Sequence, residues 1–407
     1  MAELTRYKLS DLYELSSGIS TKPEQAGHGY PFCSFSTVFN NAFLPEELPD
    51  LMDTSDQERI TYSIKAGDVF LTRTSETVDE LGMSSVAVRD YSNATFSGFL
   101  KRLRPKSDKA YPKYMALFFR GEYFRKTVTN KAVMTLRASF NEDTFNDIHV
   151  DLPSMDIQRY VGDLFYDIEC HSRNNNAICS NLEAMAKLLY DYWFVQFDFP
   201  DENGNPYKSS GGKMVWNDEL KREIPAGWEV TNIGSITRCR DSERIPVANK
   251  DRERMKGDIP YYGATGIMGY VNEAIFSGDF VLMAEDGSVM DGEGHPIIQR
   301  VSGDVWVNNH AHVLEPIKGY SCRLLMMVLK DIPVVKIKTG SIQMKINQEN
   351  MNAYKIVDIP DFLIQAINER LNVIDEKLLE LEEENQQLAS LRDFLLPMLM
   401  NGQVKVG

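Results

Sequence analysis

The chain of 407 residues lacks any apolar run approaching the roughly 20 residues that a membrane-spanning helix needs. Residues 1–6 also lack the basic region followed by an apolar stretch that marks a secretory signal. Cysteine is scarce: five thiols are scattered and never spaced as CxxC, which argues for free thiols in a reducing cytoplasm rather than disulfides or zinc. These absences predict a cytoplasmic protein that makes no membrane contact.

The chain also lacks a positive net charge. Its 44 Lys and Arg against 59 Asp and Glu give −15, which at first argues against nucleic acid as a partner. The charge is unevenly placed, however. Residues 101–137 contain eleven Lys and Arg against two acids, whereas residues 361–384 contain eight acids against two cations. A solvated face explains such runs as well as a binding surface does, so nucleic acid stays open as a partner.

What the chain does contain is an internal repeat. Residues 151–158, which begin Asp-Leu-Pro and end Ile-Gln, return 207 residues later as residues 358–365, and each copy leads into a long helical pattern. Upstream, residues 67–71 (GDVFL) recur as residues 278–282 (GDFVL), and Pro105 is matched by Pro316. Each copy has the pattern of short β-strands followed by one long helix. The repeat predicts an α+β fold with two β-rich domains and two long helices.

Both helical patterns carry apolar residues at alternating steps of three and four, the pattern of a coiled-coil seam. Neither seam has an obvious partner except the other, which favours an antiparallel coiled coil over helices that each lie on their own domain. Asn175 and Asn385 interrupt the seams, and a buried Asn there lowers stability but fixes register and partner. The predicted seam residues are Leu164, Ile168, Asn175, Ile178, Leu182 and Leu189 in the first helix, and Leu371, Ile374, Leu378, Leu381, Asn385, Leu388 and Leu395 in the second.

A stretch dense in Gly, Pro, Asn and Ser follows the first helix and predicts a linker. We therefore divide the chain into a first β-rich domain (1–153), a central helix (154–200), a linker (201–223), a second β-rich domain (224–358) and a C-terminal helix (359–407). The stretch from Ile157 to Trp193 of the central helix would be about 55 Å long at ~1.5 Å per residue. That length exceeds one turn of B-DNA, roughly 34–36 Å, so domains at its two ends would reach adjacent major-groove segments.

Motifs for catalysis are scarce. Residues 263–269 are spaced GxxGxxG rather than GxGxxG, and residues 211–213 lack the remainder of a phosphate-binding loop. The acidic loop 286–293 does not fit an EF-hand, and His310 and His312 lack ligand partners at zinc spacing. A nuclease-like pattern occurs twice, but neither copy places its carboxylates on converging strands. The sequence predicts a binding protein without catalytic residues or a metal site.

Several segments resemble the specificity subunits of type I restriction–modification systems. Residues 188–200 (LLYDYWFVQFDFP), the stretch 204–213 and residues 223–230 (EIPAGWEV) are similar to the central region of that family. Residues 395–404 (LLPMLMNGQV) are similar to its C-terminal end, and residues 259–263 (IPYYG) and 308–312 (NNHAH) to its second recognition domain. The resemblance covers the whole architecture and is weakest in the first domain, where target choice varies.

The resemblance implies a non-catalytic subunit with pseudo-twofold symmetry. Two target-recognition domains would each read one half of a split double-stranded DNA sequence. The two halves should differ, because the repeated segments of the chain are more alike than the stretches between them. The helices would dock two methyltransferase subunits and, through them, a restriction/translocase subunit. S-adenosylmethionine would belong to the methyltransferase. The alternative from a different class is an acidic coiled-coil scaffold that joins two protein-binding domains.

Candidate DNA contacts follow from side-chain chemistry. Lys and Arg neutralise phosphates, Arg, Asn and Gln have bidentate geometry for base edges, and an exposed Tyr either stacks on an unstacked base or packs. The phosphate candidates are Lys101, Arg102, Arg104 and Lys106 in the first domain, and Arg238, Arg240, Lys336, Lys338 and Lys345 in the second. The base candidates are Arg137, Asn308, Asn309 and Gln343, with His310, Tyr261 and Tyr262 as further contacts.

Overall fold

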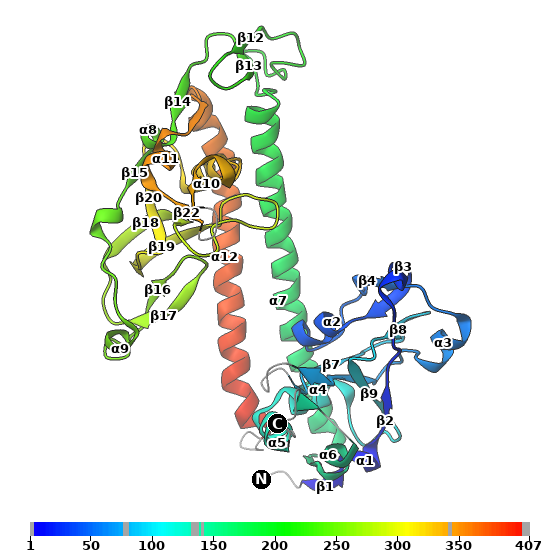
Figure 1. Ribbon diagram of the computed structural model, residues 1–407. Coiled ribbons are helices and arrows are strands. Elements are labelled where there is room, and N and C mark those ends of the chain that lie inside the picture. Colours follow the sequence, from blue (N-terminus) through cyan, green and yellow to red (C-terminus); the bar gives the residue numbers. More distant parts are fainter. Residues whose placement is uncertain (1–3, 76–80, 132–137, 140–141, 341–343, 401–407) are drawn as a thin grey trace. The chain divides into compact units, whose positions relative to one another are not determined.

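The computed structural model describes residues 4–75, 81–131, 138–139, 142–340 and 344–400. The chain divides into two compact units (Figure 1). Unit 1 comprises residues 1–176 with 383–407, and unit 2 comprises residues 177–382. Helices and small sheets occur in both, so the fold is α+β, as the sequence predicts. No helix among the described residues is both long and apolar enough to cross a membrane.

Unit 1 is built on a four-stranded antiparallel sheet in the order β2 (Tyr13–Ser17), β9 (Leu100–Pro105), β5 (Val69–Thr72), β7 (Ser84–Val86). A second sheet has the order β4 (Asp50–Met52), β3 (Ala26–Cys33), β8 (Thr95–Phe96), with β3 and β8 parallel. Two strand pairs complete the unit: β1 (Thr5–Lys8) with β11 (His149–Leu152), and β6 (Thr74–Ser75) with β10 (Ala138–Ser139).

One helix covers the central sheet of unit 1. This helix, α4 (Pro112–Arg120), begins with a proline, which is favourable there because the first helical N–H needs no partner. Its buried residues Met115 and Phe119 share a core with Val69 and Leu71 of β5. The other short helices are α1 (Leu9–Leu12), α2 (Phe35–Asn40), α3 (Asp56–Thr61), α5 (Glu122–Lys131) and α6 (Glu142–Asp147).

Unit 2 is built on a six-stranded sheet in the order β15 (Thr237–Cys239), β20 (Ala311–Pro316), β18 (Phe276–Ala284), β19 (Ile298–Val307), β16 (Ile259–Tyr262), β17 (Ile267–Val271). All neighbours are antiparallel except β16 and β19, which are parallel. Three strand pairs complete the unit: β12 (Met214–Asn217) with β13 (Arg222–Pro225), β14 (Val230–Asn232) with β23 (Lys355–Val357), and β21 (Lys338–Thr339) with β22 (Lys345–Ile346).

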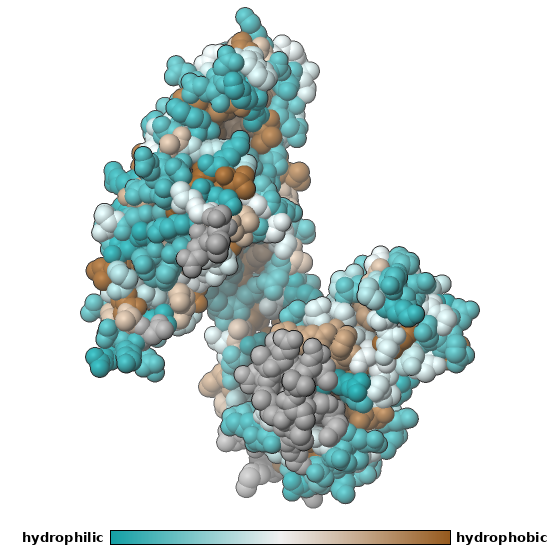
Figure 2. Space-filling view, in the orientation of Figure 1, coloured by the Kyte–Doolittle hydropathy of each residue, from teal (hydrophilic) through white to brown (hydrophobic). Residues whose placement is uncertain are grey.

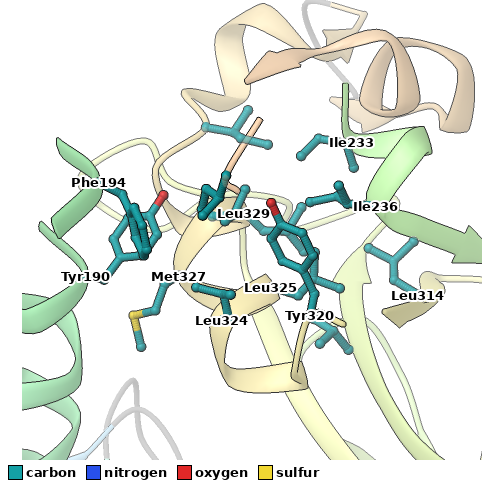
Figure 3. Packing of buried hydrophobic residues seen from close by; sticks show 14 of the residues in the cluster. Tyr190, Phe194, Ile233, Ile236, Leu314, Tyr320, Leu324, Leu325, Met327 and Leu329 are labelled. Carbon is teal, nitrogen blue, oxygen red and sulfur yellow. The ribbon is translucent and has the colours of Figure 1, made fainter. Parts of the chain in front are cut away.

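The main core of unit 2 gathers around α10 (Cys322–Lys330). Figure 3 shows Tyr190 and Phe194 of one long helical segment lying on one side of Leu324 and Met327 of α10. On the other side lie residues of the sheet and of α8 (Ile233–Ile236), including Ile236. Both α8 and α11 (Gln348–Ala353) begin at an Asn whose side chain accepts a backbone N–H, a favourable N-cap. The remaining helix is α9 (Asn249–Arg252).

The internal repeat extends through the whole fold. The order β2-β9-β5-β7 of unit 1 returns in unit 2 as β15-β20-β18-β19. Each unit also contains one parallel strand pair, β3 with β8 in unit 1 and β16 with β19 in unit 2. The pair β1–β11 likewise returns as β14–β23, and α4 returns as α10. The two units therefore share one framework even where their sequences differ.

Two long helices follow the two copies of this framework. The first, α7 (Met155–Tyr190), continues into a π-helical turn (Asp191–Val195), and the second is α12 (Asp361–Met400). Within unit 1, Asn175 Nδ2 donates to Asn385 Oδ1 over 3.2 Å, and Arg392 lies 3.4 Å from Glu169. Along these contacts the residue numbers rise in α7 where they fall in α12, so the two helices are antiparallel.

The seam of α7 departs from a strict heptad. Asn175 is buried, but the predicted seam residue Ile178 is 43% exposed, and the buried stripe continues through Ala186 to Tyr190. An α-helix has 3.6 residues per turn, so a stripe followed along a straight helix drifts away from a 3.5-residue repeat. The other predicted seam residues are buried or half-buried: Leu164, Ile168, Leu182, Leu189, Leu371, Ile374, Leu378, Leu381, Asn385, Leu388 and Leu395.

The predicted linker, residues 201–223, contains secondary structure. Its second half forms the hairpin of β12 and β13. Its first half is held by Asp198, whose carboxylate accepts from Ser209 N and Oγ, each over 2.7 Å. The rings of Phe199 and Tyr207 stack at 4.8 Å, and Phe199 stacks on Trp228 at 5.0 Å. The glycine and proline residues of this stretch predicted turns, but they gave no sign of the hairpin.

Candidate nucleic-acid interface

The two arginines of β9 that were predicted to bind phosphate instead make contacts within unit 1. Arg104 forms a two-point ion pair with Asp68, with Nε–Oδ1 at 2.8 Å and a second nitrogen–oxygen contact at 2.6 Å. Asp68 is fully buried, and Arg104 also donates to Ser63 O over 2.8 Å. Arg102 is only 8% exposed, donates to the same carbonyl, and lies over the Phe96 ring. Both arginines therefore have a structural role.

The two lysines of the same segment remain nearer the surface. Lys101 Nζ donates to Ser17 Oγ over 2.8 Å, and Lys106, which is exposed, donates to Ser10 O over 2.5 Å. Partial burial and, next in size, the nearby Arg73 lower the pKa of Lys101. A nearby anion would favour the charged form of this lysine.

The predicted arginines of unit 2 face carboxylates. Arg240 pairs with Glu243 and lies 3.1 Å from Glu315. The hydrogen bonds that it donates to these acids, first of all to Glu243, raise the pKa of its guanidinium. Arg238 is more exposed and lies 3.5 Å from the same Glu315. The two arginines thus share two acids, so the local charge is close to neutral. A phosphate would have to displace a carboxylate to bind Arg240.

The two predicted tyrosines lie on the parallel strand β16. Tyr261 is 2% exposed and belongs to a small core with Val271 and Trp306, which fits packing rather than stacking on a base. Tyr262 is half-buried beside a second core of the sheet. Burial raises the pKa of the Tyr262 hydroxyl. Both rings therefore support the edge of the sheet.

Three predicted contacts of unit 2, Asn308, Asn309 and His310, form one tight turn between β19 and β20. Asn308 is buried, and its Oδ1 accepts the backbone N–H of His310 over 2.8 Å. Asn309 and His310 are exposed, and His310 Nδ1 lies 2.6 Å from Asp286 Oδ1. The turn therefore holds two polar side chains at the surface on a fixed backbone, an arrangement suited to hydrogen bonding with base edges.

A network of largely buried, charged side chains lies next to this turn. His312 Nδ1 faces Asp241 Oδ2 at 2.5 Å, and Arg244 lies 2.7 Å from Glu285. Lys345, one of the predicted phosphate contacts, lies 2.8 Å from the same Glu285. Burial by itself would raise the pKa of Glu285, but the hydrogen bonds from Lys345 and Arg244 outweigh it and lower the pKa. These contacts hold in place the ends of the strands that carry the turn.

The same network includes the one group of possible metal ligands found among the described residues. Ligand atoms of Cys239, Asp241 and His312 all lie within 4.8 Å of one another. Arg244 lies 3.4 Å from Asp241, however, and the second oxygen of that carboxylate accepts Val313 N–H over 2.9 Å. A neighbouring cation and committed hydrogen bonds fit a salt-bridge network better than a cation site.

Two further predicted phosphate contacts, Lys336 and Lys338, lie in a 3-10 helical turn (Val334–Lys336) and in β21. Lys336 is exposed, and Lys338 is half-buried with Nζ 3.4 Å from Met344 Sδ. Arg137 and Gln343 lie outside the described residues. The structure thus gathers Asn309, His310 and Lys345 around one network in unit 2 and leaves Lys101 and Lys106 as the predicted cations nearest the surface of unit 1.

Comparison with known proteins places these observations in a family. The family model for the type I restriction modification DNA specificity domain matches residues 225–390. The Type I restriction enzyme MjaIX specificity subunit of Methanocaldococcus jannaschii is 26% identical, covering 79% of this chain and 75% of that protein. The HindI specificity subunit of Haemophilus influenzae is 21% identical, covering 99% of this chain and 100% of that protein. The chain is thus similar, over most of its length, to type I restriction enzyme specificity subunits.

A solved structure of the same family has the same fold. The S subunit of a type I restriction–modification system from M. genitalium matches with a TM-score of 0.62 at 14% identity, covering 98% of this chain and 96% of that one. At this identity the match shows the fold alone. The resemblance inferred from the central and terminal segments of the sequence is confirmed by the family model and by the two relatives.

Sequence reasoning did not identify the buried residues that hold these surfaces in place. Asp68, Glu285 and Asp375 are buried carboxylates whose arginine partners lie 36 to 75 residues away in the sequence, so no local spacing reveals them. One signal was available for Asp68, which belongs to the repeated Gly-Asp of residues 67–71. Its repeat counterpart Asp279 lies 3.8 Å from Arg300.

Proposed function

We propose that this chain is the non-catalytic DNA sequence-recognition subunit of a type I restriction–modification complex. Each unit reads one half of an asymmetric, bipartite double-stranded target. The observation that carries the proposal is the repeated framework of a specificity-family chain, whose two copies have the same strand order but different exposed side chains at equivalent places. A shared framework positions two surfaces alike, and unlike surfaces read unlike sequences.

The side chains offered to DNA differ in kind between the units. In unit 1 they are cations near the surface, Lys101 and Lys106, which suit phosphates. In unit 2 they are the exposed polar residues Asn309 and His310, which suit base edges, and the exposed Lys336, which suits a phosphate. Phosphate contacts fix position and base contacts carry sequence information, so both kinds belong in a recognition surface.

The long helices are proposed to dock two methyltransferase subunits and, through them, a restriction subunit. Large apolar side chains stand exposed on them: Met185 and Leu188 on α7 are 57% and 68% exposed, and Phe362 and Val373 on α12 are similarly exposed. Exposed apolar groups of this kind mark surfaces that partners cover. S-adenosylmethionine, the methyl donor, would bind to the methyltransferase rather than to this chain.

Footprinting tests this proposal. The full chain would be purified alone and together with its methyltransferase, and each preparation would be incubated with genomic duplex fragments before nuclease protection is mapped. We expect a protected site of two separated halves, seen chiefly with the assembled complex. A chain that protects no DNA in either preparation would support the acidic scaffold instead. Cleavage of DNA by the chain with a divalent metal alone would indicate a nuclease.

A further inference from the structure

The turn that follows β8 in unit 1 is held by three hydrogen bonds. Its first residue, Ser97, donates its N–H to the carbonyl of Cys33, the last residue of β3, over 3.0 Å. Its third residue, Phe99, donates its N–H to Ser97 Oγ over 3.2 Å. The carbonyl of Phe99 accepts the N–H of Arg73, the first residue after β5, over 2.8 Å. Three strands therefore fix this backbone.

The turn that follows β19 in unit 2 is held by the same three hydrogen bonds. Asn308 donates its N–H to the carbonyl of Tyr262, the last residue of β16, over 3.0 Å. His310 donates its N–H to Asn308 Oδ1 over 2.8 Å. The carbonyl of His310 accepts the N–H of Glu285, the first residue after β18, over 2.8 Å. The two turns are thus equivalent, bond for bond, in the repeated framework.

What the equivalent turns present to solvent differs completely. Phe99 is 60% exposed, although its backbone is fixed and burial of so large an apolar ring is ordinarily favourable. The equivalent His310 is exposed and is held at 2.6 Å by Asp286. The framework therefore does not determine the side chain at this position, and the position is occupied by an apolar ring in one unit and a polar ring in the other.

The charge beside the two turns differs as well. The residue hydrogen-bonded to the turn is Arg73 in unit 1 and Glu285 in unit 2. Arg73 lies near Lys101, and although Glu142 partly offsets the effect, burial and Arg73 together lower the pKa of that lysine. Two neighbouring cations beside an exposed aromatic ring are complementary to a phosphate backbone with bases beyond it.

We propose that the equivalent turns, residues 97–99 and 308–310, are the base-reading tips of the two units, with Phe99 and His310 as specificity-determining residues. This inference rests on the proposed function. Phe99 would contact a thymine methyl or enter a base step, as apolar side chains do in DNA complexes. His310, with Asn309 beside it, would hydrogen-bond to a base edge. A fixed backbone that carries a variable side chain allows the recognised base to change without disturbing the fold.

Reciprocal substitution tests this inference. The full chains carrying Phe99→His and His310→Phe would each be assembled with the methyltransferase, and the base preference of each complex would be read by selection from random-sequence duplexes. Phe99→His is expected to change the preference at one or two base pairs in one half of the target, by about 5- to 150-fold per position. His310→Phe is expected to change the other half only, so the untouched half reports correct folding in each variant.

The matched control is Tyr123→His, which alters an aromatic side chain of unit 1 with 55% exposure that lies on α5. It should leave both halves unchanged. The inference is overturned if the two variants alter the same half, weaken all sequences alike, or change nothing, while the unsubstituted complex still selects a split target. If the unsubstituted complex selects no sequence, both the proposed function and this inference fail.

Discussion

Buried carboxylates determine, residue by residue, which cations remain for a ligand. Asp68 engages Arg104, and Glu285 engages both Arg244 and Lys345. Removing one partner of such a pair leaves a buried charge without compensation, which costs more than an exposed ion pair contributes. The acids therefore stabilise the framework and also limit the positive surface that faces DNA.

The carboxylate of Glu285 should make unit 2 sensitive to acid. Its pKa is lowered in the folded chain, so the stability it contributes is fully present above the unfolded value, about 4.3, and is lost as pH falls through the folded value. Glu285→Gln should cost about 1–3 kcal/mol at pH 7, because its cationic partners lose their acceptor. This difference from the unsubstituted chain should shrink below about pH 4.

Urea unfolding followed by tryptophan fluorescence measures this difference, since all four tryptophans lie in unit 2. The control is Glu273→Gln, which removes an exposed carboxylate of the same unit. A Glu285→Gln cost that stays constant from pH 7 to acid would contradict the assigned role.

The sequence predicted the kinds of residue at the interface better than their roles. Side-chain chemistry selects Arg102 and Arg104 as phosphate ligands because both are cationic and lie in a basic stretch. Their actual partners, Ser63 and Asp68, lie 36 to 41 residues away and are brought close only by the pairing of β5 with β9. Asn308 was predicted to contact a base edge, but the structure buries it in a turn whose equivalence to that of Ser97 is visible only in the hydrogen bonds.

At the scale of elements, each unit is attached to a long helix by polar contacts. In unit 2, Asp375 of α12 pairs with Arg300 of β19 at 2.7 Å and with Arg323 of α10 at 2.5 Å. In unit 1, Gln158 of α7 donates to Lys109 O and accepts from Tyr111 N. These contacts join helix and recognition surface into one body within each unit.

Asp375→Ala should detach this contact in unit 2. Arg323 is buried and would lose its carboxylate partner, and the largely buried Arg300 would keep only Asp279 at 3.8 Å, so we expect a loss of about 3–5 kcal/mol in the free energy of unfolding. Glu376→Ala removes the exposed neighbouring carboxylate on the same helix and should change stability by less than about 0.5 kcal/mol. Fluorescence-detected urea unfolding compares the two. Equal effects of the two variants would show that the buried pair does not hold the helix.

The polar layer between α7 and α12 should behave as a coupled pair. Asn175 and Asn385 contact each other directly, and Asn175 also donates to Glu384 over 2.9 Å. Asn175→Leu or Asn385→Leu alone should cost about 1–3 kcal/mol, because the partner amide loses one of its hydrogen bonds. The double variant should recover part of that cost, a coupling of roughly 0.5–3 kcal/mol measured by calorimetric unfolding. Asn181→Leu, at an exposed site of α7, is the control; strictly additive costs would exclude the coupling.

Helix existence was predictable where element detail was not. The three-four spacing identified both long helices, with α7 expected over 154–200 and observed over Met155–Tyr190 before a π-helical turn. The side facing the partner was predicted less well, because the buried stripe leaves the heptad after Asn175 and Ile178 turns outward. The hairpin of β12 and β13 was missed because its strands are short and surrounded by turn-forming residues.

At the scale of the whole molecule, duplication explains most of the architecture. A short repeated segment in the sequence, residues 151–158 and 358–365, marks the entry into the two long helices. The strand order repeats even where residues do not, because packing requires only apolar side chains of suitable size in each strand. The surface between is free to differ, which is why the sequence alone could not name the residues that read DNA.

The central claim is that the two units read different halves of one split site. Its most direct test is to map methylated bases in the host genome with and without this gene. The expected result is a methylated motif of two unlike half-sequences separated by unspecified bases, present with the gene and absent without it. A methylation pattern that does not change when the gene is removed would contradict this function, and so would a gene-dependent motif that is continuous or palindromic.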